Sequence, residues 1–105
     1  MSVPSNGVYR VACSAAVLRQ LREWGEAMPT PEARAAYVSA LRTMNQHLRT
    51  DPTTWGDPWF RLVHLNLTLY HRWQRPLGVI SAVDEVRRLV YVREFRLFPD
   101  PGSTA

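Results

Sequence analysis

The stretch RPLGVISAVDEVRRLVYVREFRLFP, from Arg75 to Pro99, holds two apolar runs on either side of a charged DEVRR segment. Apolar and β-branched runs joined by a short polar segment are typical of a β-hairpin. The stretch predicts a strand over Leu77–Val83, a turn over Asp84–Arg87 and a last strand over Arg88–Leu97. We expect the following side chains to contribute most to the core: Val79, Val83, Leu89, Tyr91 and Phe95.

The segment before this hairpin, WFRLVHLNLTLYHRW, runs from Trp59 to Trp73 and also has a period of two. One parity holds Val63, Leu65, Leu67, Leu69 and Trp73, and the other holds His64, Tyr70 and Arg72. Alternate residues of a strand point to opposite faces of the sheet, so the leucine parity is expected to face the core. The segment forms either one long strand or two strands broken near Asn66.

Two helices are predicted in the N-terminal half of the chain. Ser14 offers an N-cap to the first, whose apolar residues recur at helical spacing as far as Met28. Thr30 caps the second, which has Pro31 at its first position and continues to about Arg49. The link between the helices is short, which predicts an antiparallel helical hairpin.

A first strand over Gly7–Cys13 and a turn-rich loop over Thr50–Pro58 complete the element order β-α-α-β-β-β. We expect an α+β fold, in which an antiparallel sheet of about four strands carries the N-terminal helical hairpin on one face. The length fits a single domain over residues 1–105, with an ordered core over 7–98 and a flexible tail over 99–105.

Composition narrows the function classes. The formal charge is +4, and all 13 basic residues are arginine, which suits planar, bidentate recognition of phosphate or carboxylate. Three scattered histidines and the single Cys13 do not form a zinc site, so we expect neither a metal nor another cofactor. No apolar stretch approaches 18 residues and the N-terminus does not resemble a signal peptide, which predicts a cytoplasmic protein with no membrane contact.

The segments YRV, LRTDP, WFRLV and VISAVDEVRRLVYV occur in this order between Tyr9 and Leu97. Together they resemble the RelE/ParE toxin superfamily. That resemblance implies a cognate antitoxin-like protein as partner, and either RNA on the ribosome or DNA gyrase as target. Family ribonucleases cut mRNA with arginines, other basic residues and often a tyrosine or histidine on the sheet. A homodimer mate is a further partner that the sheet and helical hairpin would suit.

The chain departs from the ribonuclease branch of that family at several positions. Arg75 is the arginine nearest the start of the penultimate strand, but it comes early and is followed by Pro76. No tyrosine or histidine follows Leu97, and the branch's lysines are absent. These departures favour a toxin-module protein that binds a protein partner. The alternative is a metal-free mRNA endoribonuclease, so enzymatic activity stays an open question.

Metal-free RNA cleavage needs a base for the 2′-hydroxyl, a cation for the phosphate and an acid for the leaving oxygen. The candidate catalytic residues are His64, Tyr70, Arg72 and Arg96. The first three share a strand parity, and Arg96 is expected to reach the same face from the last strand. The alternative is a purely structural role, in which these four residues form the polar side of a half-buried sheet. The candidates for binding a partner or nucleic acid are Arg61, Arg75, Arg93, Trp55 and Trp59.

A remote alternative comes from CSAAVLR, Cys13 to Arg19, which has the Cys-x5-Arg spacing of tyrosine-phosphatase-like phosphate loops. A thiolate there would be favoured by a helix N-terminus. The four residues after Ser14 include no glycine to curl backbone N–H groups around a phosphate, and they continue the first helix instead.

Overall fold

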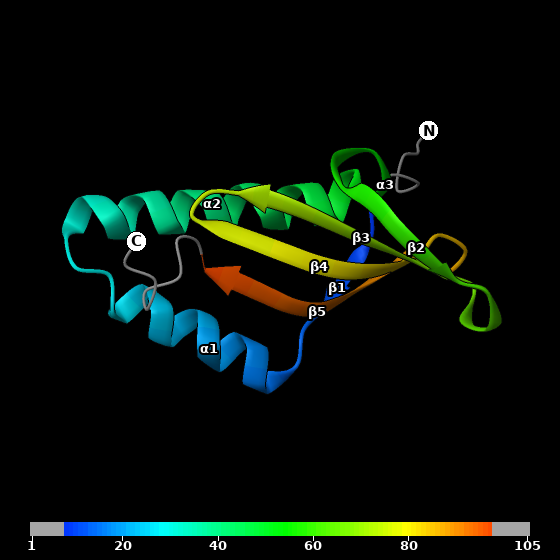
Figure 1. Ribbon diagram of the computed structural model, residues 1–105, viewed down its shortest axis with the longest axis horizontal. Helices are drawn as coiled ribbons and strands as arrows, with labels where there is room; N and C mark the ends of the chain where they lie inside the picture. Colours follow the sequence, from blue (N-terminus) through cyan, green and yellow to red (C-terminus); the bar gives the residue numbers. More distant parts are fainter. Residues whose placement is uncertain (1–7, 98–105) are drawn as a thin grey trace.

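The computed structural model describes residues 8–97, in which three α-helices and a 3-10 turn accompany one five-stranded sheet (Figure 1). The elements in chain order are β1 (Arg10–Ala12), α1 (Ala15–Glu26), α2 (Pro31–Thr50), α3 (Pro52–Trp55), β2 (Asp57–Leu62), η2 (Val63–Leu65), β3 (Leu67–Gln74), β4 (Leu77–Asp84) and β5 (Leu89–Leu97). The tail predicted over 99–105 lies outside the described residues. No helix within 8–97 is long and apolar enough to span a membrane.

The strands lie in the order β1-β5-β4-β3-β2, with β1 parallel to β5 and all other neighbours antiparallel. This confirms a mixed α+β fold with a mostly antiparallel sheet, but the expected number of about four strands was too low. The segment from Trp59 to Trp73 is two strands, because η2 and Asn66, in the left-handed region with φ 55°, reverse the chain between them.

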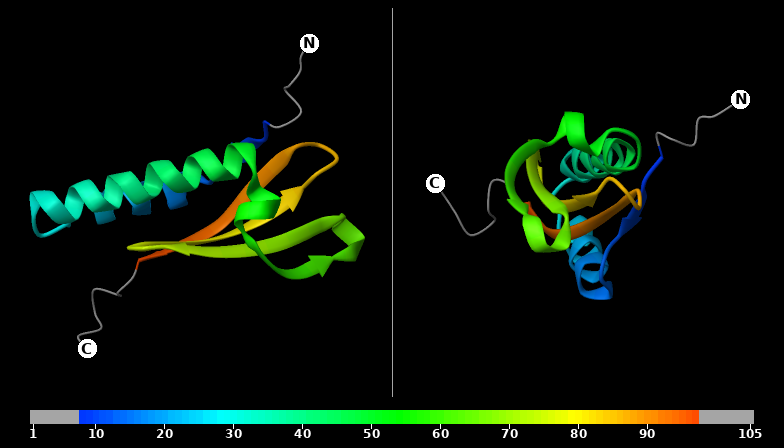
Figure 2. Two further views of the ribbon diagram at one scale, coloured as in Figure 1. Left: turned by 90° about the horizontal axis from the view of Figure 1, so that it is seen from above. Right: turned by 90° about the vertical axis from the view of Figure 1, so that its right-hand side faces the viewer.

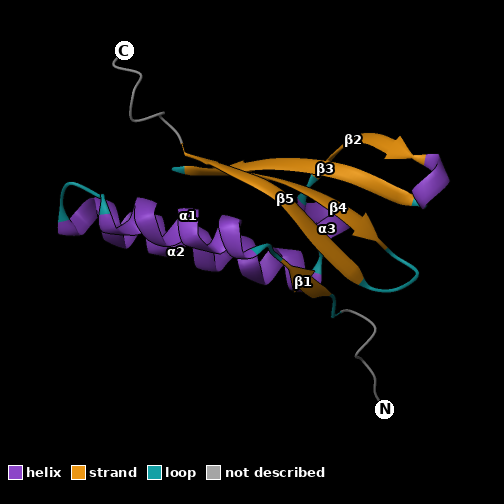
Figure 3. Cartoon of the chain, turned by 90° about the horizontal axis from the view of Figure 1, so that it is seen from below, coloured by secondary structure: helices purple, strands orange, loops and turns teal. Residues whose placement is uncertain are grey.

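Both long helices begin at the caps that the sequence predicts. The Ser14 Oγ accepts a hydrogen bond from the Val17 N–H at 3.1 Å, and the Thr30 Oγ1 accepts one from the Ala33 N–H at 3.0 Å. These bonds satisfy N–H groups that a helix leaves unpaired at its start. The two helices run in opposite directions and lie on one side of the sheet (Figures 1 and 3). The loop predicted over Thr50–Pro58 contains the short helix α3.

The core lies between the helices and the face of the sheet that they cover, which we call the helix face. Its buried side chains come from every long element: Tyr9, Leu21, Tyr37, Ala40, Met44, Leu48, Trp55, Tyr70, Leu77, Val79, Val83, Val90, Val92 and Phe95. No helix within residues 8–97 covers the other face of the sheet, here called the outer face (Figures 2 and 3). This asymmetry leaves the outer face available to a ligand or partner.

A β-bulge in β5 corrects the predicted core. Ile80 pairs with Glu94 and Ser81 pairs with Val92, so Arg93 is an extra residue on β5. The parity that faces the helices changes at this point, from Val90 and Val92 to Phe95 and Leu97. The predicted core residues Val79, Val83 and Phe95 are buried. Leu89 and Tyr91 were wrongly placed in the core, and Tyr91 is 37% exposed.

The parity predicted for β3 was also wrong. Tyr70 and Arg72 pair with Ser81 and Val79, which point to the helix face, whereas Leu69 pairs with Ala82 on the outer face. The prediction counted Val63 and Leu65 as core residues of one parity. Both belong to η2 instead, and they are 73% and 64% exposed. Leu69 is buried on the outer face, in a cross-strand row with its β2 and β4 partners Phe60 and Ala82.

Tyr37 gives the core a measurable pH dependence. Its hydroxyl donates a 2.7 Å hydrogen bond to the Leu21 carbonyl, and burial raises its pKa to about 12. In the unfolded chain the pKa of this tyrosine is about 10. The protonated hydroxyl therefore contributes fully to the stability of the fold below pH 10, and this contribution is lost as the pH rises through 12.

We therefore expect the unfolding free energy of the wild type to fall between pH 10 and 12, and Tyr37→Phe to make that fall shallower. Denaturant titrations at pH 8 and across the alkaline range measure both slopes. The variant also loses the hydrogen bond, about 1 kcal/mol at pH 8. Equal alkaline slopes in both proteins would contradict the assignment to Tyr37.

Candidate functional site

The outer face of the sheet is built from three cross-strand rows. The rows are Phe60–Leu69–Ala82–Tyr91, then His71–Ile80–Glu94, then Trp73–Gly78–Arg96. Directly paired residues point to the same face, so these side chains form one surface across four strands. Most of them are apolar, although none of the helices in the described part of the chain covers them.

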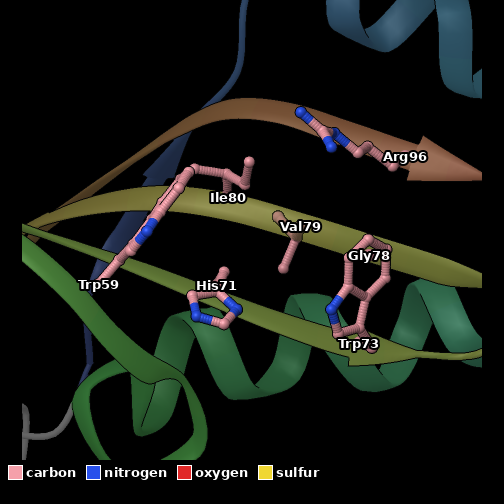
Figure 4. A pocket seen from close by; sticks show the side chains of 7 residues that line it. All are labelled: Trp59, His71, Trp73, Gly78, Val79, Ile80 and Arg96. Atoms are coloured by element: carbon pink, nitrogen blue, oxygen red, sulfur yellow. The ribbon is translucent and has the colours of Figure 1, made fainter.

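A depression with a volume of about 270 Å³ lies on this face, lined by Trp59, His71, Trp73, Gly78, Val79, Ile80 and Arg96 (Figure 4). Trp59 and Trp73 stand at its two ends, and His71 lies between them. The Trp59 and His71 rings meet edge to face, with their centroids 5.6 Å apart. We call this feature the outer-face depression.

Gly78 sets the position of one wall of the depression. A Cβ atom added there would lie 2.1 Å from two atoms of the Trp73 indole, so that ring rests directly on the glycine. Trp73 and Gly78 are partners across β3 and β4, and a larger residue at 78 would displace the ring. The Trp73 indole is nevertheless 50% exposed, so half of its surface is accessible to solvent.

Two charged groups lie at the rim of the depression. The Arg96 Nε donates to the Glu94 carboxylate at 2.6 Å, and both side chains are about half exposed. An exposed pair of this kind contributes little to stability. The Arg96 guanidinium is therefore partly neutralised by Glu94 but still accessible to an anionic group on a ligand.

The four candidate catalytic residues are not brought together. Tyr70 and Arg72 point to the helix face, Arg96 lies on the outer face, and His64 lies in the exposed turn η2. The expectation that Arg96 and Arg72 share a face was therefore wrong, because Arg72 pairs with Val79 and Arg96 with Gly78. Adjacent residues of β4 point to opposite faces.

The environments of Tyr70 and Arg72 indicate packing on the helix face and do not favour Tyr70 as a general base. Burial raises the pKa of the Tyr70 hydroxyl, and the charges of Glu85 and Tyr9 act in the same direction against an opposing effect of Arg61. A raised pKa disfavours the tyrosinate that a general base needs. The Arg72 guanidinium lies 5.6 Å from the centre of the Trp55 ring. That position gives it a packing role.

Trp55 was a candidate for binding a partner or nucleic acid, but the structure buries it. It lies in α3 and is only 8% exposed. The His47 ring stacks on it at 5.1 Å with an interplanar angle of 2°, and Arg72 covers it as well. The Asp51 carboxylate in turn contacts the His47 Nδ1 at 2.8 Å. Trp55 is thus a structural link between α2, α3 and β3.

The other predicted binding residues lie at the surface. Trp59 is 56% exposed at the end of the outer-face depression. Arg61 donates to the Thr68 Oγ1 at 2.9 Å and to the Asn66 side chain, which fastens the β2–β3 turn. Arg75 lies in the β3–β4 turn and Arg93 is the bulge residue, and both are exposed. Whether any of them binds a ligand stays a prediction.

The sequence prediction missed His71, Trp73, Gly78 and Ile80 as a joint surface. The signal was present in the alternation of His71 and Trp73, but their parity had been assigned to the core. Within residues 8–97, no group of three His, Cys, Asp or Glu side chains is placed to hold a metal ion. The depression offers one imidazole, one guanidinium and two indoles, a set that suits binding of apolar, planar or anionic groups.

Cys13 does not have the features of a phosphatase nucleophile. Burial raises the pKa of its thiol, which disfavours the thiolate. Ser14 occupies the N-cap of α1, and the residues that would form a phosphate loop are the first turn of that helix. The Cys-x5-Arg spacing therefore arises where β1 is followed by α1, and it does not mark a phosphate loop.

Residues 8–97 thus form an α+β fold in which no helix of this range covers the aromatic outer face of the sheet. This fold is similar to that of a chain in the crystal structure of the archaeal RelE–RelB complex from Pyrococcus horikoshii OT3. The match covers 88% of this chain and 97% of that chain, with a TM-score of 0.64 and 17% sequence identity. The chain therefore has a RelE-like fold. No protein-family model and no curated protein matches the sequence.

Proposed function

We propose that this chain is a RelE/ParE-like toxin-module protein that acts by binding a protein partner over its outer face. The observation that carries the proposal is the exposed aromatic surface there. Trp59, Trp73 and Phe60 are 56%, 50% and 46% exposed on the outer face, which no helix of residues 8–97 covers. Single exposed apolar residues are ordinary, whereas a contiguous patch marks an interaction surface.

The chemistry of the patch suits an antitoxin-like protein with apolar anchors and acidic flanks. Aromatic residues and arginine dominate the buried centres of protein interfaces. Arg96 and the bulge residue Arg93 lie on β5, which is one of the four strands that form the outer face. The whole chain carries a charge of +4. An acidic partner would associate faster with such a surface. The chain with a similar fold was solved in a RelE–RelB complex, and this similarity of fold supports the proposal of an antitoxin-like partner.

The dispersal of the predicted acid–base set also supports binding over RNA cleavage. His64, Tyr70 and Arg96 occupy a turn, the helix face and the outer face, so they cannot act on one phosphate. Positioned acid and base groups must lie within hydrogen-bond reach of the same reacting atoms.

A second candidate function is a metal-free endoribonuclease, which one observation favours. His71 and Arg96 line the same depression, between two indoles on which bases could stack. They would supply one acid–base group and one cation. The residues that line the depression include no second acid–base side chain for the leaving group, and the Glu94 carboxylate at its rim is paired with Arg96, so this function is ranked second.

Expression in bacteria tests the proposal. We expect the chain alone to inhibit growth while mRNA stays intact, and co-expression with the product of the adjacent gene to restore growth and yield a co-purifying complex. Growth inhibition with mRNA cuts that disappear in His71→Ala would replace the proposal by the ribonuclease. No growth defect and no co-purifying partner would refute the toxin-module function.

A further inference from the structure

The second and third rows of the outer face are complementary to each other. On each of the strands β3, β4 and β5, one residue belongs to the second row and the residue two positions away belongs to the third. β3 supplies an imidazole and an indole, β4 an aliphatic side chain and a glycine, and β5 a carboxylate and a guanidinium. The three pairs are His71 with Trp73, Ile80 with Gly78, and Glu94 with Arg96.

This pattern allows the outer face to meet a copy of itself. A two-fold axis that lies in the interface and crosses the strands between the second and third rows turns each row onto the other row of the second copy. The contacts are then Glu94 with Arg96, Ile80 with Gly78, and His71 with Trp73, each made twice. An axis through the second row itself would instead place Glu94 opposite Glu94. The charges of β5 therefore favour the first of these two registers.

The outer-face depression gives this contact its fit. Gly78 has no side chain, and the half-exposed Trp73 indole rests on it (Figure 4). Ile80 of the second copy enters the depression at this point and packs on the indole. The contact removes apolar surface of both side chains from water, which favours association.

The charged pair of β5 suits the same contact. The Arg96 and Glu94 side chains are 58% and 46% exposed, and their bond is 2.6 Å long. A guanidinium has five N–H donors, so Arg96 can keep this bond and also donate to Glu94 of the second copy. Arg96 is the only one of the chain's 13 arginines in the three rows, and Asp57 adds a carboxylate at the β2 end of the second row. The excess positive charge of the chain therefore lies mostly away from this contact.

The edges of the sheet are poorly suited to self-association. β2 forms one edge and contains Pro58, followed by a bulge before Phe60. β1 forms the other edge and is three residues long. Proline, bulges and short edge strands discourage pairing with a strand of another chain. Two copies would therefore meet through the face of the sheet.

We propose that this chain forms a two-fold symmetric dimer through its outer face, with Glu94 of each copy paired to Arg96 of the other. The second copy occupies the face until the protein partner replaces it. That competition rests on the proposed function, because the partner uses the same face, whereas the dimer itself does not depend on it.

The test uses the full chain without a partner and reverses one charge at a time. Arg96→Glu and Glu94→Arg each place like charges opposite one another in a dimer of identical copies. Arg19→Glu and Glu23→Arg make the same charge changes at exposed positions of α1 and are the matched controls. Circular dichroism establishes that all four variants fold, and analytical ultracentrifugation over a series of protein concentrations measures the dissociation constant of the dimer.

We expect each β5 variant to raise the dissociation constant at least tenfold, while the α1 controls dimerise like the wild type. An equimolar mixture of Arg96→Glu and Glu94→Arg is expected to regain near wild-type affinity, because each positive pair then faces a negative pair. A purely structural role of these residues would not produce this rescue.

A wild type that stays monomeric at every concentration would overturn the dimer. So would β5 variants that dimerise like the wild type, controls that lose as much affinity as the β5 variants, or a mixture that remains monomeric. Co-purification with the product of the adjacent gene separates the two proposals. A monomeric wild type that still yields the complex would overturn the dimer alone, and a dimer without a partner would support the dimer and refute the proposed function.

Discussion

Replacing Phe95 by alanine is expected to lower the free energy of unfolding by about 3–5 kcal/mol. Phe95 lies on the helix face of β5 and is only 7% exposed. Its partner across the sheet, Val79, is also buried in the core. Truncation removes the apolar contacts of a whole ring and leaves a cavity that the surrounding strands and helices fill only in part. Urea denaturation followed by circular dichroism measures the change.

Tyr91→Ala on the same strand is the matched control, because it also removes an aromatic ring. Tyr91 lies before the bulge, on the outer face, and is 37% exposed. Its truncation is expected to cost no more than about 1 kcal/mol. Equal losses for the two variants would place both rings in the core and would contradict the change of parity at Arg93.

The elements themselves were predictable because their signals are local. Ser14 and Thr30 accept the hydrogen bonds that their cap positions predict, and the charged DEVRR segment forms the turn between β4 and β5. In that turn the Asp84 carboxylate accepts a hydrogen bond from the Arg87 N–H at 3.0 Å. Such interactions join residues three positions apart and do not depend on the rest of the fold.

The bulge in β5 was not predictable, because it is a property of the pairing of two strands. Nothing in LVYVREFRL distinguishes a regular strand from one in which Arg93 is extra. A shift of one residue moves every later side chain to the other face. This is why Tyr91 was misplaced while Phe95 was correctly assigned to the core.

The candidate site was missed for a related reason. This sheet is apolar on both faces, so the leucine parity of β3 did not identify the helix face. Assigning that parity to the core hid His71 and Trp73, which line the outer-face depression. Trp55 and Trp59 looked alike in the sequence, but α3 buries the first and a β2 bulge leaves the second exposed.

Trp73→Ala is expected to weaken binding of the co-purified partner by at least thirtyfold, which corresponds to about 2 kcal/mol. The indole is half exposed and forms one end of the outer-face depression. Covering it would bury a large apolar surface at the centre of the interface. Isothermal titration calorimetry measures the loss, and Val86→Ala, which removes an exposed side chain from the β4–β5 turn, is the control expected to bind normally.

Gly78→Ala separates the position of this ring from its presence. The added methyl would lie 2.1 Å from the Trp73 indole, so the ring must swing away while every aromatic group remains in the protein. Alanine is favoured over glycine within a strand by about 0.5–1 kcal/mol, which offsets part of the packing lost when the ring moves. We therefore expect a folded variant with near-normal stability, altered tryptophan fluorescence and weakened partner binding. Normal binding by Gly78→Ala, beside a loss in Trp73→Ala, would show that the partner needs the indole but not its placement on Gly78.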